Sequence, residues 1–211
     1  MSSARRGQSL GLSTTNGKTP LITAHRTVVA VDVAGFGRHA RNNTNQVRVR
    51  DGMYGAIEHA FVSVGIPWTS CDQWGTVDGV LVLVPAEISK TLFVNYLPDA
   101  LVKELTIHNR THPPSEKIRM RLALHAGEIS YDSHGAAGAA ITNTCRLLES
   151  GTLKLAHAQS SAVLAIISSD WFYDEVIRHS ELSRSESYWP HSVMDAATMT
   201  RAWVRLLNAR G

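Results

Sequence analysis

Apolar runs typical of strands and hairpins dominate the first part of the chain. After Arg26, residues 27–33 are β-branched and aliphatic except for one aspartate, and they lead into a glycine-rich turn, a pattern typical of a strand buried on both faces. Residues 53–64 repeat apolar side chains at helical spacing up to Gly65, which predicts an amphipathic helix. A short strand over 68–73, a turn near Gly75 and an apolar strand over 77–85 then predict a β-hairpin.

The second part of the chain continues to alternate between the two periodicities. The pattern predicts a helix over 88–109 broken at Pro98, a strand over 120–127, a helix over 139–149, and strands over 162–168 and 202–206. In the helix over 139–149, we expect Ile141, Cys145 and Leu148 to share one face.

Strands that alternate with helices around a hairpin predict an α/β class, a sandwich of helices covering a mixed sheet. Residues 1–25 are rich in Ser, Thr, Gly and Arg, so we expect a flexible N-terminal arm followed by one domain over 26–211.

Composition narrows the class of protein. The 211 residues are 44% hydrophobic with a net charge of +3, as in ordinary globular domains, and the absence of a Lys/Arg block argues against a nucleic-acid partner. Cys71 and Cys145 form no CxxC motif and are expected to pack as small hydrophobes. No apolar run reaches ~18 residues and the N-terminus lacks a signal-peptide core, so we expect no membrane span and a cytoplasmic location.

Two aspartates stand where the pattern otherwise calls for apolar residues. Asp32 lies inside the first strand and Asp78 opens the apolar strand of the hairpin. A buried carboxylate needs a partner or a metal ion, and hard oxygen ligands suit Mg²⁺ or Mn²⁺. If the hairpin lies beside the first strand, both carboxylates converge at one edge of the sheet. The alternative for each is a strand-end cap or turn residue.

Four motifs carry a resemblance to a known family. The stretches AVDVAGFGR, VDGVLVLVP, LALHAGEI and GAAITNTCRLLES occur in the order, and with the spacing, of the motifs of class III nucleotidyl cyclases. The resemblance implies a ferredoxin-like class III cyclase fold and an enzyme that converts a nucleoside triphosphate to a 3′,5′-cyclic nucleotide and diphosphate.

The resemblance also implies a role for individual residues. Asp32, Asp78 and the carbonyl of Val33 would bind two Mn²⁺ or Mg²⁺ ions, and Arg146 would stabilise the reacting α-phosphate. Nucleotide binding would fall to Gly35, Phe36, Gly37, Trp74, Thr142 and Asn143. In this family the site is built between two subunits, so a homodimer is expected, with Arg146 reaching across the interface.

Several positions depart from the family pattern. Thr142 stands where the family places an asparagine, with Asn143 next to it, and Val77 replaces the usual glycine before the second metal aspartate. The purine-reading lysine and aspartate positions hold Trp74 and Gly135, neither of which offers the polar contacts that a purine edge needs. Trp74 could stack on a base or pack beneath the hairpin.

This pattern resembles the pyrimidine cyclases of bacterial anti-phage signalling, whose cyclic product acts on a separate effector. It favours UTP as substrate, then CTP. The alternatives are a purine cyclase and a degenerate nucleotide-binding module without catalysis.

Other polar residues have simpler explanations. The ten histidines show no HExxH spacing; His125 is expected to pack or hydrogen-bond within its strand, and His134 to lie in a surface turn. Residues 170–173 and Trp203 indicate packing positions, and no P-loop or nucleophile elbow occurs.

Overall fold

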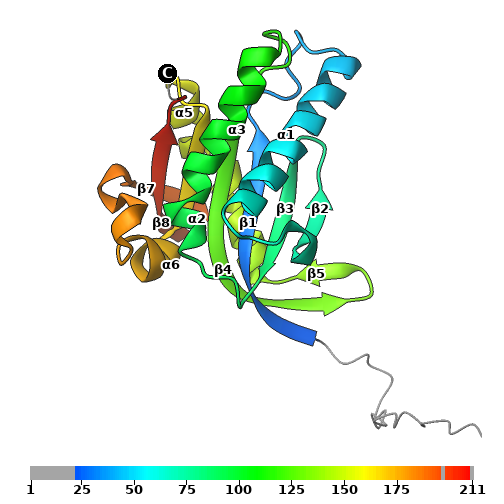
Figure 1. Cartoon of the computed structure of the whole chain (residues 1–211). Helices are drawn as coiled ribbons and strands as arrows, with labels where there is room; N and C mark the ends of the chain where they lie inside the picture. Colours follow the sequence, from blue (N-terminus) through cyan, green and yellow to red (C-terminus); the bar gives the residue numbers. More distant parts are fainter. Residues whose placement is uncertain (1–21, 196–197, 210–211) are drawn as a thin grey trace, which may run out of the picture.

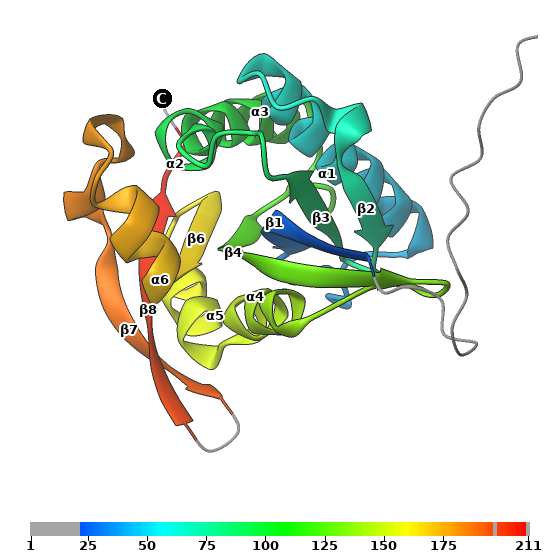
Figure 2. The same cartoon turned by 90° about the horizontal axis from the view of Figure 1, so that it is seen from below.

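A mixed β-sheet runs through the middle of the protein, and helices cover both of its faces (Figures 1 and 2). The computed structural model describes residues 22–195 and 198–209. The strand order is β2-β3-β1-β4-β6-β8-β7, with β5 paired to β4. All neighbours are antiparallel except β4 and β6, which are parallel. The predicted α/β class with a mixed, helix-covered sheet is confirmed.

The elements have the following bounds. The strands are β1 Ile22–Val33, β2 Asp72–Gly75, β3 Gly79–Pro85, β4 Met120–Asp132, β5 Gly135–Ala137, β6 Leu164–Ser169, β7 Trp189–Asp195 and β8 Thr198–Leu207. The α-helices are α1 Asn43–Ser63, α2 Leu92–Asn95, α3 Leu97–Thr111, α4 Ala139–Glu149, α5 Gly151–Ala158 and α6 Asp170–Phe172. Short 3₁₀ turns are η1 Trp68–Ser70, η3 Glu181–Ser183 and η4 Ser185–Ser187, and η2 Tyr173–Ile177 is a π-helical turn.

Strand β1 is a central strand, as its apolar run predicted. It pairs with β3 on one side and β4 on the other, and Val28, Val29 and Val31 are at most 2% exposed. The strand begins at Ile22, earlier than the expected Arg26. The rest of the expected N-terminal arm, residues 1–21, lies outside the described residues.

Helices α1, α2 and α3 cover one face of the sheet. Helix α1 begins well before its apolar stretch because Asn42 and Asn45 form a capping box, in which each side chain accepts a hydrogen bond from the other residue's backbone N–H. The expected break in the next helical stretch occurs at Tyr96, and Pro98 lies in the first turn of α3, where its missing N–H leaves no hydrogen bond unmade.

The predicted hairpin is confirmed, but its first strand is shorter than predicted. The predicted strand over 68–73 is wrong at its start, because Trp68–Ser70 forms a 3₁₀ turn and β2 covers only Asp72–Gly75. Trp68 is instead a core residue, packed edge-on against Phe61 at a centroid distance of 5.3 Å. Asp78 lies in the turn between β2 and β3, one residue before β3, and not within the strand as predicted.

Helices α4 and α5 cover the opposite face. Helix α4 has the predicted bounds. Of the predicted apolar face, Leu148 is buried and Ile141 is half-buried, and the prediction is wrong at Cys145. The buried residues of α4 are Ala140, Thr144, Leu147 and Leu148, whereas Cys145 is exposed. The buried residues follow the i, i+4, i+7, i+8 spacing, and Thr144 is accommodated because its hydroxyl donates to the carbonyl of Ala140 at 2.7 Å.

The far end of the sheet is an arm of two long strands. Strands β7 and β8 pair along their length and project past α5 (Figure 2). Strand β8 was predicted in part, and β7 was not predicted. In the described part of the chain, no helix is both long and apolar enough to cross a membrane.

Candidate active site

Asp32 lies at the end of β1, between its two neighbouring strands. It faces Gly79 of β3 on one side and Arg121 of β4 on the other, and it is only 4% exposed. Both carboxylate oxygens accept hydrogen bonds from Arg121, from Nε at 2.7 Å and from Nη2 at 2.6 Å. Asp32 is thus held in a bidentate ion pair that the sequence did not indicate.

The electrostatic environment of Asp32 is mixed. Burial raises the pKa of the Asp32 carboxyl above its ordinary value, and the hydrogen bonds and charge of Arg121 act in the opposite direction. The negative charges of Asp78 and Glu149 add to the rise of this pKa. The second predicted aspartate is therefore close enough to Asp32 to influence it, as is the last residue of α4.

Asp78 lies in the turn of the β2–β3 hairpin, beside the end of β1. Its carbonyl accepts a hydrogen bond from Val33 N at 2.9 Å, and the residue is half-buried. Gly79 explains the closeness of the two strands, since a Cβ at this position would lie 2.1 Å from the carbonyl oxygen of Val31. Arg50 of α1 donates to the carbonyl of Val77 at 2.9 Å and so tethers the turn. The sequence indicated Asp78 but not the need for glycine after it.

The two aspartates fit a divalent cation of the oxygen-preferring kind. They offer hard carboxylate oxygens at adjacent strand ends. Across the described ranges, no group of three or more His, Cys, Asp or Glu side chains gathers as a metal site. The protein would therefore supply a minority of the ligands, as is usual for Mg²⁺ bound together with substrate phosphates and water. The Val33 carbonyl, the expected third ligand, accepts a hydrogen bond from Phe36 N at 3.2 Å and keeps one lone pair.

The glycine-rich loop follows β1 and is basic. Gly35 has a φ of +66°, a backbone conformation that favours glycine. Phe36 is buried in the core and Gly37 is exposed with open space around it. Arg41 is bound to the carbonyls of Gly35, Ser115 and Lys117.

Two further observations define the charge of this loop. Burial, together with the nearby positive charge of Arg38, lowers the pKa of both Arg41 and Arg119. Within the described residues, the exposed Arg38 side chain makes neither a hydrogen bond nor an ion pair. The loop thus presents positive charge at the surface, which suits an anionic ligand.

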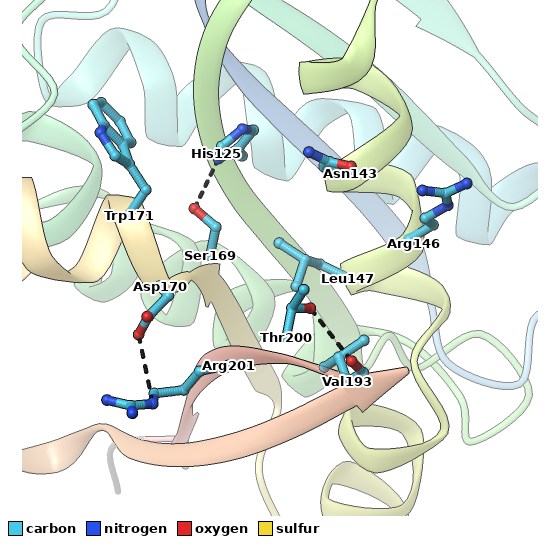
Figure 3. Close-up of a pocket in the computed structure, with 10 residues that line it drawn as sticks. All are labelled: His125, Asn143, Arg146, Leu147, Ser169, Asp170, Trp171, Val193, Thr200 and Arg201. Atoms are coloured by element: carbon cyan, nitrogen blue, oxygen red, sulfur yellow. Dashed lines mark hydrogen bonds and ion pairs between the residues drawn. The ribbon is translucent and has the colours of Figure 1, made fainter. Parts of the chain in front are cut away.

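The polar residues of α4 lie on its solvent side. Thr142, Asn143 and Arg146 are all exposed. The Thr142 hydroxyl donates to the Gly138 carbonyl at 3.3 Å, so it is directed toward the helix backbone. Asn143 and Arg146 border a pocket of about 370 Å³ between α4, β4, α6 and the β7–β8 arm (Figure 3).

The rest of this pocket comes from residues that the sequence did not bring together. His125 Nδ1 and Ser169 Oγ are hydrogen-bonded at 2.7 Å, and Trp171 packs edge-on against the His125 ring. Arg201 Nε lies 3.9 Å from an Asp170 oxygen, in an exposed ion pair. His125 was expected to pack or hydrogen-bond within its strand, but its partner Ser169 is the last residue of the neighbouring strand β6. Burial is the main reason that the pKa of His125 lies below the ordinary value. Arg201 had no signal in the sequence, because β8 was predicted to begin only after it.

The aspartates and the pocket are separate in one chain. Neither Asp32 nor Asp78 lines the pocket that holds Asn143 and Arg146, and neither does any residue of the loop over 34–38. In Figure 3 the Arg146 guanidinium points away from the His125 side of the pocket. One chain therefore presents these two sets of polar residues at separate places.

The two predicted base-reading positions do lie together. A Cβ on Gly135 would be 3.5 Å from Trp74 Nε1, and the φ of +133° at Gly135 disfavours any side chain there. Trp74 is half-buried against the α4 side of the sheet. Beside it, Tyr131 accepts a hydrogen bond from Arg26 at 3.1 Å and donates to Asp72 at 2.7 Å. His134 lies in the exposed turn expected for it, where its N–H donates to Asp132 at 2.7 Å.

Comparisons with known proteins find similarity in structure but not in sequence. No family model matches the sequence, and no curated protein matches it. Solved structures do match. The adenylate/guanylate cyclase/hydrolase of Silicibacter pomeroyi superposes with a TM-score of 0.61 at 18% identity, covering 90% of this chain and 100% of that one.

Two further structures agree. The guanylyl cyclase Cya2 superposes with a TM-score of 0.61 at 15% identity, over 92% of this chain and 96% of its own. The catalytic core of a rhodopsin-guanylyl cyclase with converted specificity, in complex with ATPαS, gives 0.60 at 14% identity, over 89% and 99%. At these identities the likeness establishes architecture. The chain has the fold of class III nucleotidyl cyclase domains.

Proposed function

We propose that this protein is a nucleotidyl cyclase, which converts a nucleoside triphosphate to a 3′,5′-cyclic nucleotide and diphosphate. The observation that carries the proposal is the placement of Asp32 and Asp78 at adjacent strand ends, within a cyclase fold. Two carboxylates at such a position suit divalent cations that also bind the phosphates of a substrate.

The proposed reaction is attack of the ribose 3′-oxygen on the α-phosphorus, with diphosphate as the leaving group. Mn²⁺ or Mg²⁺ ions, when bound, would lower the pKa of the 3′-hydroxyl and neutralise charge on the phosphates. Asp32 and Asp78 would hold the ions. The backbone of Gly35–Gly37, together with the exposed Arg38, would bind the distal phosphates.

Arg146 would stabilise the negative charge that develops on the α-phosphate. Its separation from the aspartates in one chain supports a site completed by a second copy. Asn143 and Arg146 are exposed on α4 and border an open pocket, a surface that a partner chain carrying its own Asp32 and Asp78 could complete. We therefore propose an active homodimer with shared sites.

The proposed base is a pyrimidine, with UTP preferred to CTP. The Trp74 ring lies against Gly135, and the φ of +133° at Gly135 disfavours the acidic side chain that purine cyclases carry there. A bulky indole over this position favours a smaller base. The cyclic product would act as a messenger on a separate effector, in anti-phage defence.

Purified full-length protein incubated with each of the four ribonucleoside triphosphates and Mn²⁺ tests the function. We expect cyclic UMP and an equal amount of diphosphate from UTP, and neither product from Asp32→Asn or Asp78→Asn. A cyclic purine nucleotide as product would support the proposed cyclase activity and contradict the proposed pyrimidine substrate. The absence of a cyclic product from all four nucleotides would contradict the proposed cyclase activity.

A second candidate function is nucleotide binding without catalysis. Two observations favour it: Arg121 occupies both oxygens of Asp32, and the Thr142 hydroxyl is directed to the helix backbone. The same incubation separates the candidates when nucleotide binding is measured beside turnover. Binding without turnover, at every nucleotide, would support this module.

A further inference from the structure

Arg41 connects the glycine-rich loop after β1 to the loop between α3 and β4. Its Nη1 donates to the Gly35 carbonyl at 3.1 Å. Its Nε and Nη2 donate to the carbonyls of Ser115 and Lys117 at 2.9 and 2.6 Å. Both loops lie at the same end of the sheet, where β1 ends and β4 begins (Figure 1). One half-buried side chain thus bonds two segments that are distant in the sequence.

The loop between α3 and β4 is itself held in place by two helices. Glu116 is 2% exposed and accepts hydrogen bonds from Asn45 at 3.0 Å and from Arg48 at 2.9 Å, both on α1. The side chain of Asn109, on α3, accepts from the Ile118 N–H at 2.7 Å and donates to the Ile118 carbonyl at 2.8 Å. Because α1 and α3 both fix this loop, a side chain bonded to it is bonded to a rigid part of the protein.

The glycine-rich loop has two unused backbone donors. Within the described ranges, the N–H groups of Gly35 and Gly37 make no hydrogen bond, whereas those of Ala34 and Phe36 donate to backbone carbonyls at 2.8 and 3.2 Å. Successive backbone N–H groups in a turn can bind phosphate oxygens. Glycine loses more conformational freedom on ordering than any other residue, so such a loop is costly to fix. A bond to the Gly35 carbonyl fixes the loop before a ligand binds.

Resting on the proposed function, we propose that Arg41 is a positioning residue for the phosphates of the substrate. By holding the Gly35 carbonyl, it keeps the loop in the conformation that offers the N–H groups of Gly35 and Gly37 to the distal phosphates. Its three hydrogen bonds go to backbone carbonyls, so it acts through the loop and not by contact with the substrate. A loop that is ordered before binding loses less entropy when the phosphates bind, which raises the affinity.

Calorimetric titration of the full-length protein with inorganic triphosphate and Mg²⁺ tests the proposal without turnover. Arg41→Met removes all three hydrogen bonds and keeps much of the volume. We expect its dissociation constant for triphosphate to rise at least ~10-fold, because the loop must then be ordered at the moment of binding. Arg41→Lys keeps the charge, but its single nitrogen cannot meet the three carbonyls as the planar guanidinium does, so binding at least ~3-fold weaker than the parent's is expected.

Arg119→Met is the matched control. The Arg119 side chain likewise donates to three backbone carbonyls, those of His157, Ser160 and Ala162. Burial, followed by the charge of Arg38, lowers the pKa of both Arg119 and Arg41, so both cations lie near the glycine-rich loop. The control removes the same charge without removing a bond to the loop, and its triphosphate affinity should stay within about threefold of the parent's. An equal loss of affinity in Arg41→Met and Arg119→Met would overturn the proposal, because charge alone would then explain it.

Turnover by Arg41→Lys separates a positioning role from general support of the fold, and this variant remains informative if Arg41→Met does not fold. For the nucleotide that the parent chain cyclises, KM should rise ~3-fold or more while kcat stays within about twofold, because ground-state and transition-state binding weaken equally. A lower kcat at unchanged KM, or triphosphate binding equal to the parent's in the Arg41 variants, would overturn the proposal. Weaker triphosphate binding by these variants, with no cyclic product from the parent chain, would support the positioning role and contradict the proposed cyclase activity.

Discussion

The two halves of the candidate site differ in how far the chain encloses them. At the sheet edge, Asp32 is enclosed, bonded on both oxygens and flanked by backbone hydrogen bonds to the hairpin turn. On α4, Asn143 and Arg146 are exposed and border an open pocket. The first half is built into the sheet, whereas the second lies on the surface of the protein. Changes in the first half should therefore affect stability and activity together, and changes in the second should affect activity alone.

The largest effect is expected at Asp32. Asp32→Ala leaves the Arg121 guanidinium in the sheet without its partner, and breaking such a pair typically costs about 3–5 kcal/mol. Denaturant unfolding of the metal-free protein should show this loss together with the loss of activity. Asp78→Ala, at a half-buried turn position, is the control and should lose activity at a cost of less than about 1 kcal/mol in stability. An equal loss of stability in Asp32→Ala and Asp78→Ala would contradict the expected difference between the buried and the half-buried aspartate.

Arg146→Ala should lower activity nearly as much as the Asp32 variant does, but it should leave stability unchanged. A donor that stabilises charge in the transition state is typically worth about 2.7–4 kcal/mol, so kcat should fall by roughly 10²–10³. The Tm should stay within about 1 °C, because the side chain is exposed. Arg178→Ala, which removes an exposed arginine paired with Asp174, is the control and should change neither quantity. Near-normal turnover by Arg146→Ala would remove this residue from the mechanism.

Stability should also depend on pH through His157, a buried residue of α5. This residue is 1% exposed, and burial is the first cause that lowers its pKa from 6.5 to about 4, followed in the same direction by the charges of Arg119 and Arg121. Its Nε2 bonds to the Ala162 carbonyl at 2.9 Å, and Nδ1 has no partner among the described residues. The folded protein therefore keeps the neutral ring while the unfolded chain takes up a proton below pH 6.5.

The stabilisation from neutral His157 is complete above pH 6.5 and is lost as the pH falls toward 4. The loss amounts to at most about 3 kcal/mol. Chemical unfolding of the parent chain and of His157→Gln across this range measures it. The variant, which cannot titrate, should show a flatter dependence; identical slopes would contradict the assignment.

The smallest effect is expected for base choice at Trp74. Trp74→Ala opens the space above Gly135, so the ratio of kcat/KM for UTP over ATP should fall by roughly tenfold, about 1.4 kcal/mol. Turnover of the four nucleotides by the variant provides the measurement. An unchanged ratio would mean that Trp74 only packs beneath the hairpin.

The sequence predicted the enclosed half better than the open one. A lone aspartate in a β-branched strand and a second at a hairpin stand out because apolar surroundings leave few explanations for a carboxylate. Arg121 did not stand out, because its pairing with Asp32 depends on the register of two strands far apart in the chain. Gly79 was also missed, since its requirement arises from the close approach of another strand.

The open half depends on features that local patterns encode weakly. Helix α4 had the right bounds, but Cys145 was assigned to the core because cysteine is usually buried, whereas Thr144 took that place with its hydroxyl bonded to the helix backbone. Strand β7 contains a proline and mixed polar residues, so no alternation marked it. The pocket between α4 and the β7–β8 arm is a tertiary feature that neither pattern could indicate.

Mixing two inactive variants tests most directly whether the two halves work together across a dimer. Asp32→Asn and Arg146→Ala chains, carrying different tags, are mixed, and heterodimers are confirmed by sequential purification on both tags. Each heterodimer would hold one intact site, assembled from the Asp32 and Asp78 of one chain and the Arg146 of the other. Cyclic nucleotide formation should recover to about half of the parent rate per purified heterodimer. Confirmed heterodimers that remain inactive would contradict a catalytic site shared between two copies of this chain.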